Sequence, residues 1–386
     1  MSKKVEQKTQ KTQYMDYALL AVVIFLVCFG LVMMYSTSYY AGISKFNDGM
    51  FFFKKQCRAA IIGVCAMMFV SVFPVKIYER FALFAYLFSF VLLLLVWTPL
   101  GVEAYGARRW ISIPLLGSFQ PAEFSKVAVI IFIPILICKA GIRIKDKKVL
   151  FKIAAVGAIA AAGIFIITNN LSSALIVMGI VCAMLFVAHP KTAVWLGTAG
   201  GIAALALIAV RIMDKMMDTS SRFRLRRILV WLHPEQYSDD GGLQVLQGLY
   251  AIGSGGFWGK GLGNSAQKMI IPEVQNDMIL SIICEELGVC GVIVLFTLFG
   301  MMLYRLMFIA QNAPDMYSSL IVTGIFAHIA IQVVLNVCVV LNVIPTTGIS
   351  LPFISYGGTA LLISMAEIGV ALGISRKIKL EEPENV

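Results

Sequence analysis

Near its start the chain reads YALLAVVIFLVCFGLVMM from residue 17 to residue 34, with no charged side chain in the run. Crossing the hydrocarbon core of a bilayer takes roughly 20 predominantly apolar residues in a helix. The run is also longer than the roughly 7–15 apolar residues of a secretory signal, and no small-residue cleavage site follows it closely. We therefore predict a first transmembrane helix that is retained. Four lysines precede it, namely Lys3, Lys4, Lys8 and Lys11.

The rest of the chain has the same apolar character. Hydrophobic residues make up 59% of the 386 positions and charged residues only 14%, whereas a soluble domain carries about 25% charged residues. This composition excludes a soluble enzyme, a disordered protein and a secreted disulfide scaffold. The formal net charge is +11. In a membrane protein such an excess indicates cytoplasmic loops and contact with anionic headgroups rather than with nucleic acid.

Ten apolar blocks are candidates for membrane spans. Because backbone groups cannot stay unpaired in lipid, we expect every block to be an α-helix, and we predict an all-α integral membrane protein. The short loops carry sixteen basic residues on the side of the N-terminus and six on the other side, which predicts that both termini are cytoplasmic. The approximate limits of the blocks are 17–37, 59–75, 81–98, 121–140, 150–168, 171–188, 192–213, 277–305, 318–341 and 357–375.

Low-complexity linkers that would divide the chain are absent from the sequence. We expect a single membrane domain over residues 17–375, between a cytoplasmic N-terminal tail of residues 1–16 and a cytoplasmic C-terminal tail of residues 376–386. A polar segment from about residue 214 to residue 276 separates the seventh and eighth spans. This segment is predicted to be a large extracytoplasmic loop.

Ionisable residues at membrane depth cost about 2.5–3.5 kcal/mol each on insertion scales, so they are functional candidates. One group precedes and begins the fourth span, in GARRWI at 106–111 and QPAEFSK at 120–126. Glu123 and Lys126 are three residues apart on one helical face and can pair. The alternative interpretation is a structural ion pair below an interfacial anchor, Trp110, with snorkelling arginines beside it.

A second group lies in the large loop. Four arginines stand close together, at Arg222, Arg224, Arg226 and Arg227, and the run GSGGFWGKGLG follows at 253–263. Closely spaced glycines let a backbone approach a ligand or act as a hinge. No strand precedes this run, so it does not match a dinucleotide-binding fingerprint, and it does not form a Walker loop. The arginine run is equally typical of an amphipathic helix on anionic lipid.

The third group lies in the eighth span. Asp277 stands at its outer mouth, and Glu285 and Glu286 follow two turns deeper. At about 100° per residue the three carboxylates do not share one face, so we interpret the two glutamates as structural residues that hold helices together. Asp277 is also placed to cap the N-terminus of its helix, which is the alternative to a chemical role.

One apolar segment cannot form a regular helix. The sequence PTTGISLPFISYGG, at 345–358, contains two prolines and three glycines. Irregular backbone at membrane depth is tolerated only where it packs within protein or lines a cavity. We therefore predict a cavity that opens outward between this segment and the eighth span. The residues of the segment with a predicted structural role are Pro345, Gly348, Pro352, Gly357 and Gly358.

In these stretches the chain resembles the SEDS family, which includes FtsW, RodA and SpoVE, and above all its FtsW and SpoVE branch. The resemblance implies a ten-span peptidoglycan glycosyltransferase that polymerises lipid II at the outer face of the bacterial plasma membrane, for cell division or for cell-shape or sporulation wall synthesis. It implies that Asp277 is the acidic residue needed for polymerisation and that Arg109 and Trp110 are functionally sensitive. The motifs, in the family's order, are GARRWI, QPAEFSK, GSGGFWGKGLGNSAQK at 253–268, PEVQNDMILSIICEELG at 272–288 and PTTGISLPFISYGG.

The chain departs from the family at two places. Where the family often shows a QPDLGT-like stretch, residues 168–173 read TNNLSS, and we assign no role to them. Asn276 stands where many relatives carry threonine.

Transfer of a sugar from a lipid diphosphate requires one general base, because the attacking hydroxyl loses a proton. The leaving diphosphate requires positive charge, from basic residues or from a divalent cation. A glycosidase would need two opposed carboxylates, whereas this chain offers one outer carboxylate among many basic residues. We therefore predict that Asp277 is the base and that partial burial raises its pKa.

The substrate contacts are predicted from the same chemistry. Trp110 would stack on a sugar, and Arg109 and Lys126 would hold the diphosphate together with Arg222 or Lys268. A divalent cation, Mg²⁺ or Mn²⁺, is a candidate cofactor whose ligands the sequence does not identify, and no organic cofactor is expected. The full predicted substrate-binding set is Arg108, Arg109, Trp110, Glu123, Lys126, Arg222, Lys268, Ser355 and Tyr356.

The resemblance implies a class B penicillin-binding protein as partner, together with other divisome or elongasome membrane proteins. Two alternatives to a polymerase stay open. A lipid II flippase would suit broken helices and the deep carboxylates Glu285, Glu286 and Glu367, and a non-catalytic divisome scaffold is the other. The polar residues gather toward the outer face, whereas alternating access needs a path from both sides, and this asymmetry favours the polymerase.

Overall fold

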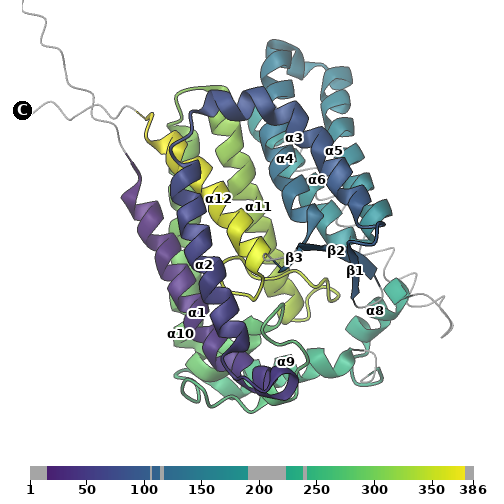
Figure 1. The fold of residues 1–386 in the computed structure, drawn as a ribbon, viewed down its shortest axis with the longest axis vertical. Coiled ribbons are helices and arrows are strands. Elements are labelled where there is room, and N and C mark those ends of the chain that lie inside the picture. The colour runs from purple at the N-terminus through teal and green to yellow at the C-terminus, as the bar shows by residue number, and fades with distance from the viewer. Residues whose placement is uncertain (1–14, 105–106, 114–116, 190–222, 238–240, 379–386) are drawn as a thin grey trace, which may run out of the picture.

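The computed structural model describes residues 15–104, 107–113, 117–189, 223–237 and 241–378. Helices make up most of this part, and a small sheet lies beside them (Figure 1). The helices are α1 (Tyr17–Phe46), α2 (Phe51–Val70), α3 (Val75–Leu95), α4 (Pro121–Ala140), α5 (Lys147–Thr168), α6 (Leu171–Ala188), α8 (Phe223–Leu232), α9 (Gly242–Gly255), α10 (Ile279–Gln311), α11 (Met316–Val340) and α12 (Gly358–Ser375), with the short 3-10 helices η1 (Gly141–Lys145) and η3 (Gln267–Met269).

Eight of the described helices, α1, α3, α4, α5, α6, α10, α11 and α12, are long and apolar enough to cross a membrane. This finding confirms a multi-pass helical membrane protein. The expected span at 59–75 corresponds to α2, which is not among the eight because its first half carries Lys54, Lys55 and Arg58. The expected seventh span, at 192–213, lies outside the described residues.

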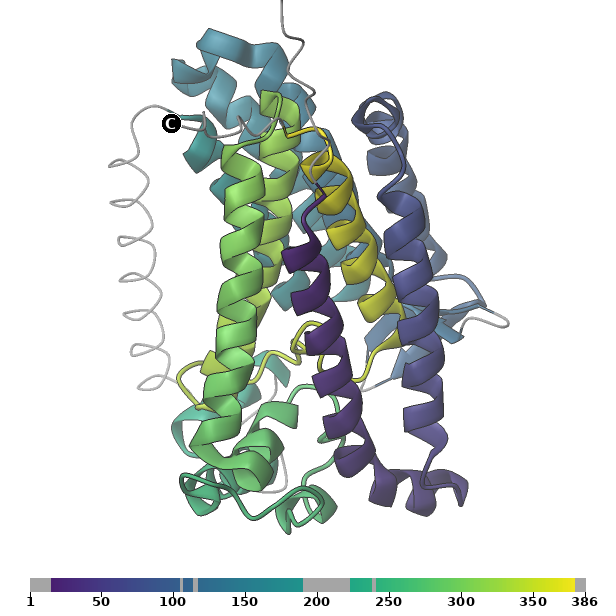
Figure 2. The same ribbon diagram turned by 90° about the vertical axis from the view of Figure 1, so that its left-hand side faces the viewer.

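The first span begins and the last span ends at the same side of the bundle. Asp16 caps α1 by accepting a hydrogen bond from the Leu19 backbone N–H at 2.9 Å, and its own N–H donates to Ser375 Oγ at 3.1 Å. Near the end of α10, Arg305 contacts the Asp16 carboxylate at 2.7 Å. α1 packs against α10 and α2, which run alongside it (Figure 2). Both chain ends of the bundle therefore lie on the same side, as expected; that this side is cytoplasmic stays a prediction.

A small sheet is added to the expected helical fold, in the loop between α3 and α4. Its antiparallel strands lie in the order β1 (Gly101–Ala104), β2 (Ala107–Ile113) and β3 (Gly117–Phe119). In the register of the sheet, Trp110 is opposite Val102. β1 and β3, with four and three residues, are too short for an alternating pattern, and β2 reads ARRWISI, in which two arginines stand side by side, so the sequence did not indicate the sheet. The sheet contacts α4 and brings the middle of β2 to the start of that helix.

Two irregular segments shape the other end of the bundle, where α10 and α12 begin; we call this the loop end. The expected eighth span, 277–305, is not one straight helix, because α10 is interrupted at Gly288, with φ 65° and ψ −165°. Between α11 and α12 the chain runs without a helix over residues 341–357, as its prolines and glycines predict. Gly348 has φ 69° there, in the left-handed region that favours glycine.

Candidate functional site

A cavity of about 580 Å³ lies at the loop end of the bundle. Its walls come from β2, the first turns of α4 and α6, the helices α8 and α9, the segment before α10, and residues 346–350. The predicted cavity between the irregular segment and the eighth span is therefore present, and elements far apart in the sequence close around it.

Asp277 stands in the wall of this cavity, two residues before α10 begins. Its carboxylate accepts a hydrogen bond from Gln244 Nε2 at 3.3 Å, and its backbone carbonyl accepts one from Asn336 Nδ2 at 2.8 Å. Burial raises the pKa of the Asp277 carboxyl above its ordinary value, while the nearby Arg227 and Gln244 oppose that shift. The capping interpretation is wrong, since the N-cap of α10 is Met278 and no side chain caps the helix.

Glu123 and Lys126 form the predicted ion pair, with 2.8 Å between Lys126 Nζ and Glu123 Oε2. Both side chains are buried, and both line the cavity. The lysine ammonium has no hydrogen-bond partner among the described residues beyond this ion pair. The buried hydroxyl of Thr347, another wall residue, has no hydrogen-bond partner among them either. Buried polar atoms are normally hydrogen-bonded, so these two atoms are suited to a polar ligand.

The neighbours in β2 take different positions. Arg109 and Trp110 line the cavity, and Arg109 Nη2 donates to the Asn169 carbonyl at 3.2 Å. Arg108 is exposed, contacts Glu103 of β1 at 3.4 Å and is not part of the cavity wall. The pairing of β1 with β2 shifts register here, because Val102 is opposite Trp110 while Glu103 is opposite Arg108. Arg109 is therefore an extra residue in β2, and such an irregularity redirects side chains from the regular alternation of a strand.

Arg227 of α8 is a wall residue that the sequence did not single out from its arginine run. Its Nη1 donates to the Thr346 carbonyl at 3.2 Å, which ties α8 to the irregular segment. Burial lowers the pKa of Arg227, and the Asp277 charge opposes that change. Arg222, which was the predicted contact, lies outside the described residues.

Two further wall residues were missed from the sequence. Gln244 of α9 reaches Asp277, but nothing in its sequence context marks it. Asn170, in the stretch to which we assigned no role, also lines the cavity, and its Oδ1 caps α6 by accepting from the Ser173 N–H at 3.1 Å. The difference from the family motif at residues 168–173 could have drawn attention to Asn170.

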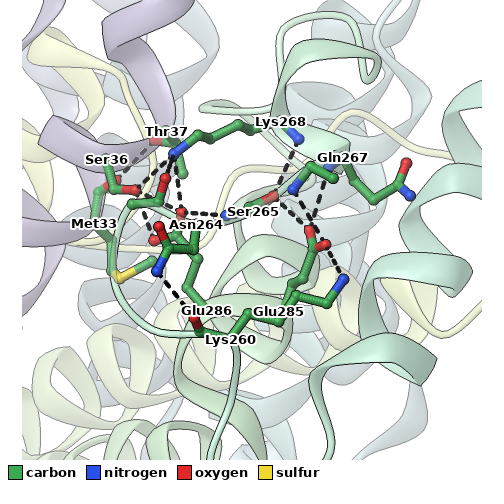
Figure 3. Close-up of polar contacts among 12 residues, drawn as sticks. Met33, Ser36, Thr37, Lys260, Asn264, Ser265, Gln267, Lys268, Glu285 and Glu286 are labelled. Atoms are coloured by element: carbon green, nitrogen blue, oxygen red, sulfur yellow. Dashed lines mark hydrogen bonds and ion pairs between the residues drawn. The ribbon is translucent and has the colours of Figure 1, made fainter.

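Three predicted residues lie apart from the cavity. Lys268, expected at the diphosphate, instead contacts Glu286 at 3.2 Å in a separate polar cluster (Figure 3). Ser355 and Tyr356 line a much smaller neighbouring cavity of about 10 Å³. Ser355 Oγ accepts from the Leu351 N–H at 2.8 Å, and burial raises the pKa of Tyr356. None of the three residues is part of the wall of the larger cavity.

The charges of the cavity wall favour an anion. Glu123 is matched by Lys126, and Glu273 of the wall is matched by Lys45 of α1. Among the described residues, the remaining ionisable wall groups are Arg109, Arg227 and Asp277, whose formal sum is +2 − 1 = +1. Burial favours the neutral form of Asp277, which makes the surroundings more positive still.

The candidate divalent cation finds no ready-made ligand set in the described part of the chain. Three or more His, Cys, Asp or Glu side chains do not converge anywhere among those residues. The basic wall residues Arg109, Lys126 and Arg227 can supply positive charge on their own.

The fold and the cavity define a multi-pass membrane protein with a polar, basic site at one end of its helix bundle. Residues 17–380 match the family model described as cell cycle protein, of FtsW, RodA and SpoVE. The chain belongs to this family.

Relatives of known name cover nearly the whole chain. Stage V sporulation protein E of Bacillus subtilis is 36% identical over 95% of this chain and 99% of its own length. The probable peptidoglycan glycosyltransferase FtsW of Trichlorobacter lovleyi is 36% identical over 95% of this chain and 94% of its own.

Solved structures share the fold. A chain from a study of how a peptidoglycan synthase complex coordinates polymerisation and crosslinking superimposes with a TM-score of 0.76, at 25% identity, over 94% of this chain and 98% of its own. The rod shape determining protein RodA of Thermus thermophilus gives 0.66 at 23% identity, over 95% and 98%.

Proposed function

We propose that this chain is a peptidoglycan glycosyltransferase that polymerises lipid II into glycan strands at the outer face of the bacterial plasma membrane, with Asp277 as the general base. Relatives named peptidoglycan glycosyltransferase FtsW support the reaction class. The observation that carries the assignment of the base is the position of Asp277, a carboxylate with a raised pKa in a cavity wall that also holds Arg109, Lys126 and Arg227.

In the proposed reaction a sugar hydroxyl attacks the anomeric carbon that carries the lipid diphosphate. The new C–O bond forms as the bond to the diphosphate oxygen breaks, and the proton of the hydroxyl passes to the Asp277 carboxylate. A carboxylate with a raised pKa accepts this proton more readily than an ordinary aspartate does. Gln244 and the Asn336 contact to the backbone fix the carboxylate in place.

The leaving diphosphate carries the negative charge away without a proton. Arg109, Arg227 and Lys126 would stabilise this charge, because fixed positive groups in a site of low dielectric need no reorganisation during the reaction. Trp110, beside Arg109 in β2, would provide a face for a sugar ring. Should a divalent cation bind with the substrate, it would add positive charge at the same diphosphate.

Partner proteins belong to the same proposal. The structural neighbour from a peptidoglycan synthase complex supports a class B penicillin-binding protein as the partner of this chain. Other divisome or elongasome membrane proteins would join the same assembly, for division, cell shape or sporulation.

The decisive experiment is gel-resolved glycan formation from purified lipid II in detergent, with and without the partner and divalent cation. We expect polymer from the wild type and none from Asp277→Asn. The control is Asp48→Asn, which changes an exposed carboxylate between α1 and α2 that pairs with Lys54, and it should polymerise normally. Polymer from Asp277→Asn would remove Asp277 as the base, and folded wild type without product under every condition would contradict the enzyme.

A further inference from the structure

The break in α10 is filled by the glycine-rich loop, which we define as residues 256–268 and which follows α9. The carbonyls of Glu285 and Glu286 accept hydrogen bonds from the backbone N–H groups of Lys260 and Gly261, at 2.9 and 3.0 Å. Beyond the break, the N–H groups of Val289 and Cys290 donate to loop carbonyls, both at 3.1 Å. The loop thus replaces the helical hydrogen bonds that the break at Gly288 removes.

Glycines are required for this close approach. A Cβ at Gly288 would lie 2.4 Å from the Gly259 nitrogen, and a Cβ at Gly259 would lie 2.2 Å from the Glu286 carbonyl oxygen. One turn earlier, a Cβ at Gly255 would lie 1.9 Å from the Cys284 carbonyl oxygen. Loop and helix therefore meet backbone to backbone, with no room for side chains between them.

The side chains of Glu285 and Glu286 also bind the glycine-rich loop, at the place where it contacts α10; we call this place the junction. Glu285 is fully buried and accepts from Lys260 Nζ at 2.7 Å and from the Ser265 hydroxyl. The backbone N–H groups of residues 266 and 267 also donate to it, at 3.3 and 3.4 Å. These contacts hold the loop to α10 but do not reach any other spanning helix.

Glu286 extends the junction to α1. It is fully buried, and its carboxylate accepts from the Ser36 hydroxyl of α1 at 2.6 Å and from Lys268 Nζ at 3.2 Å. The Ser265 N–H also donates to it, at 3.3 Å. In Figure 3 the two lysines approach the neighbouring carboxylates separately, so the cluster contains two negative and two positive charges.

This polar cluster is separate from the cavity that contains the proposed base, since none of the side chains of the cluster lines the cavity wall. Asp277 lies two residues before the first part of α10, Ile279–Leu287, which the break at Gly288 separates from the long remainder of the helix. Glu286 is seven residues, or roughly 10 Å, from the start of that short part. Because the break interrupts the helix, the orientation of these nine residues depends on their contacts with the glycine-rich loop and with α1.

We propose that Glu286, supported by Glu285, is a positioning residue for the proposed transfer reaction. By fixing the short part of α10 to α1 and to the glycine-rich loop, it holds the Asp277 carboxylate at the place where the acceptor hydroxyl loses its proton. This inference rests on the proposed function, because it concerns the geometry of the same base. Glu286 touches neither substrate nor reacting atoms in this arrangement.

The test variant is Glu286→Gln, which keeps the shape of the side chain but removes its charge. We expect kcat for glycan formation to fall on the order of 100-fold, as for a displacement of about 1 Å in a reacting group, while KM for lipid II stays close to the wild-type value. Amide hydrogen exchange should rise at residues 256–261 and 279–290 and stay unchanged in the other described helices.

The matched control is Glu367→Gln. Glu367 of α12 is equally buried and pairs with His328 of α11 at 2.8 Å, so its loss removes the same kind of charge from the core without touching the junction. We expect a similar fall in thermal stability and no change in kcat. Should Glu286→Gln fail to fold, Ser36→Ala removes only the contact to α1, and Ser36→Thr, which keeps the hydroxyl, should restore kcat.

The outcomes separate this inference from the function on which it rests. Wild-type kcat in Glu286→Gln, or an equal fall of kcat in Glu367→Gln, would overturn the positioning role while leaving the polymerase intact. A wild type that makes no glycan would overturn the proposed function instead, and the exchange data alone would then decide whether the cluster holds the short helix. Unchanged exchange at residues 279–290 would refute it.

Discussion

Variants of the ion pair between Glu123 and Lys126 can separate the contribution of Lys126 to protein stability from its proposed contribution to substrate binding. Lys126 is fully inaccessible to solvent and Glu123 is 6% exposed, and 2.8 Å separates their charged atoms. The change Lys126→Met leaves the carboxylate buried without its partner. Breaking a buried pair in this way costs about 3–5 kcal/mol, which corresponds to roughly two to four powers of ten in the unfolding equilibrium.

Removing both charges should have a different effect. In the double variant Glu123→Met/Lys126→Met no buried charge is left over, and replacement of a whole buried pair by apolar side chains is often neutral or stabilising. We therefore expect near wild-type stability in equilibrium unfolding in detergent. Glycan formation should stay impaired, because the cation proposed to stabilise the leaving diphosphate is missing in both variants.

Four proteins complete the cycle, namely the wild type, the two single variants and the double variant, each measured for unfolding free energy and for glycan formation from lipid II. If the destabilisation of the double variant equalled the sum of the two single destabilisations, the two residues would not be energetically coupled. If activity returned together with stability in the double variant, Lys126 would have a structural role only, and the proposed diphosphate contact would be refuted.

Three further predictions follow from Asp277, which carries two of them, and from the break in α10. Because burial raises the pKa of Asp277 above 3.8, glycan formation should rise with pH through a midpoint above 3.8 and then level off, and a midpoint at or below it would contradict the assignment. The folded chain holds this proton more tightly than the unfolded chain, so stability falls as pH rises from 3.8 through the raised pKa, and Asp277→Asn should be the more stable protein at neutral pH. Gly288→Ala should cost about 1–3 kcal/mol for its backbone conformation and a similar amount for overpacking, whereas Gly253→Ala in α9, where a Cβ meets nothing within 4 Å, should be near neutral in the same unfolding assay.

The spanning helices could be predicted because each is a long apolar run, and the bilayer requires a helix for such a run. Asp277 and the pair of Glu123 and Lys126 could be singled out for the same reason, since ionisable residues beside such runs are costly. The irregular segment between α11 and α12 was visible through its prolines. In each case one physical constraint acts on neighbouring residues of the chain.

The rest depends on contacts between distant segments. The apolar pattern of α10 continues through Gly288 without a change, and only the docked loop, some thirty residues earlier, makes the break possible. Arg227 reaches the cavity because α8 packs beside residue 346, and no feature of its arginine run distinguishes it. Lys268 was expected at the diphosphate from its charge, but the buried Glu286 holds it elsewhere.

The same contacts bear on the choice between a polymerase and a flippase. A flippase needs its polar path to continue to the opposite side of the membrane, and Glu367 and the two glutamates of α10 were the residues that suggested such a path. In the described part of the chain each of these carboxylates has a partner: Glu367 has His328, and the other two have lysines of the glycine-rich loop. The cavity itself lies at the loop end, on the side where the proposed function requires the outer leaflet to supply a lipid-linked sugar. If Glu367 lay on a transport path, its change to glutamine would abolish transfer of lipid II between leaflets, whereas a polymerase that works from the outer side should form glycan undisturbed.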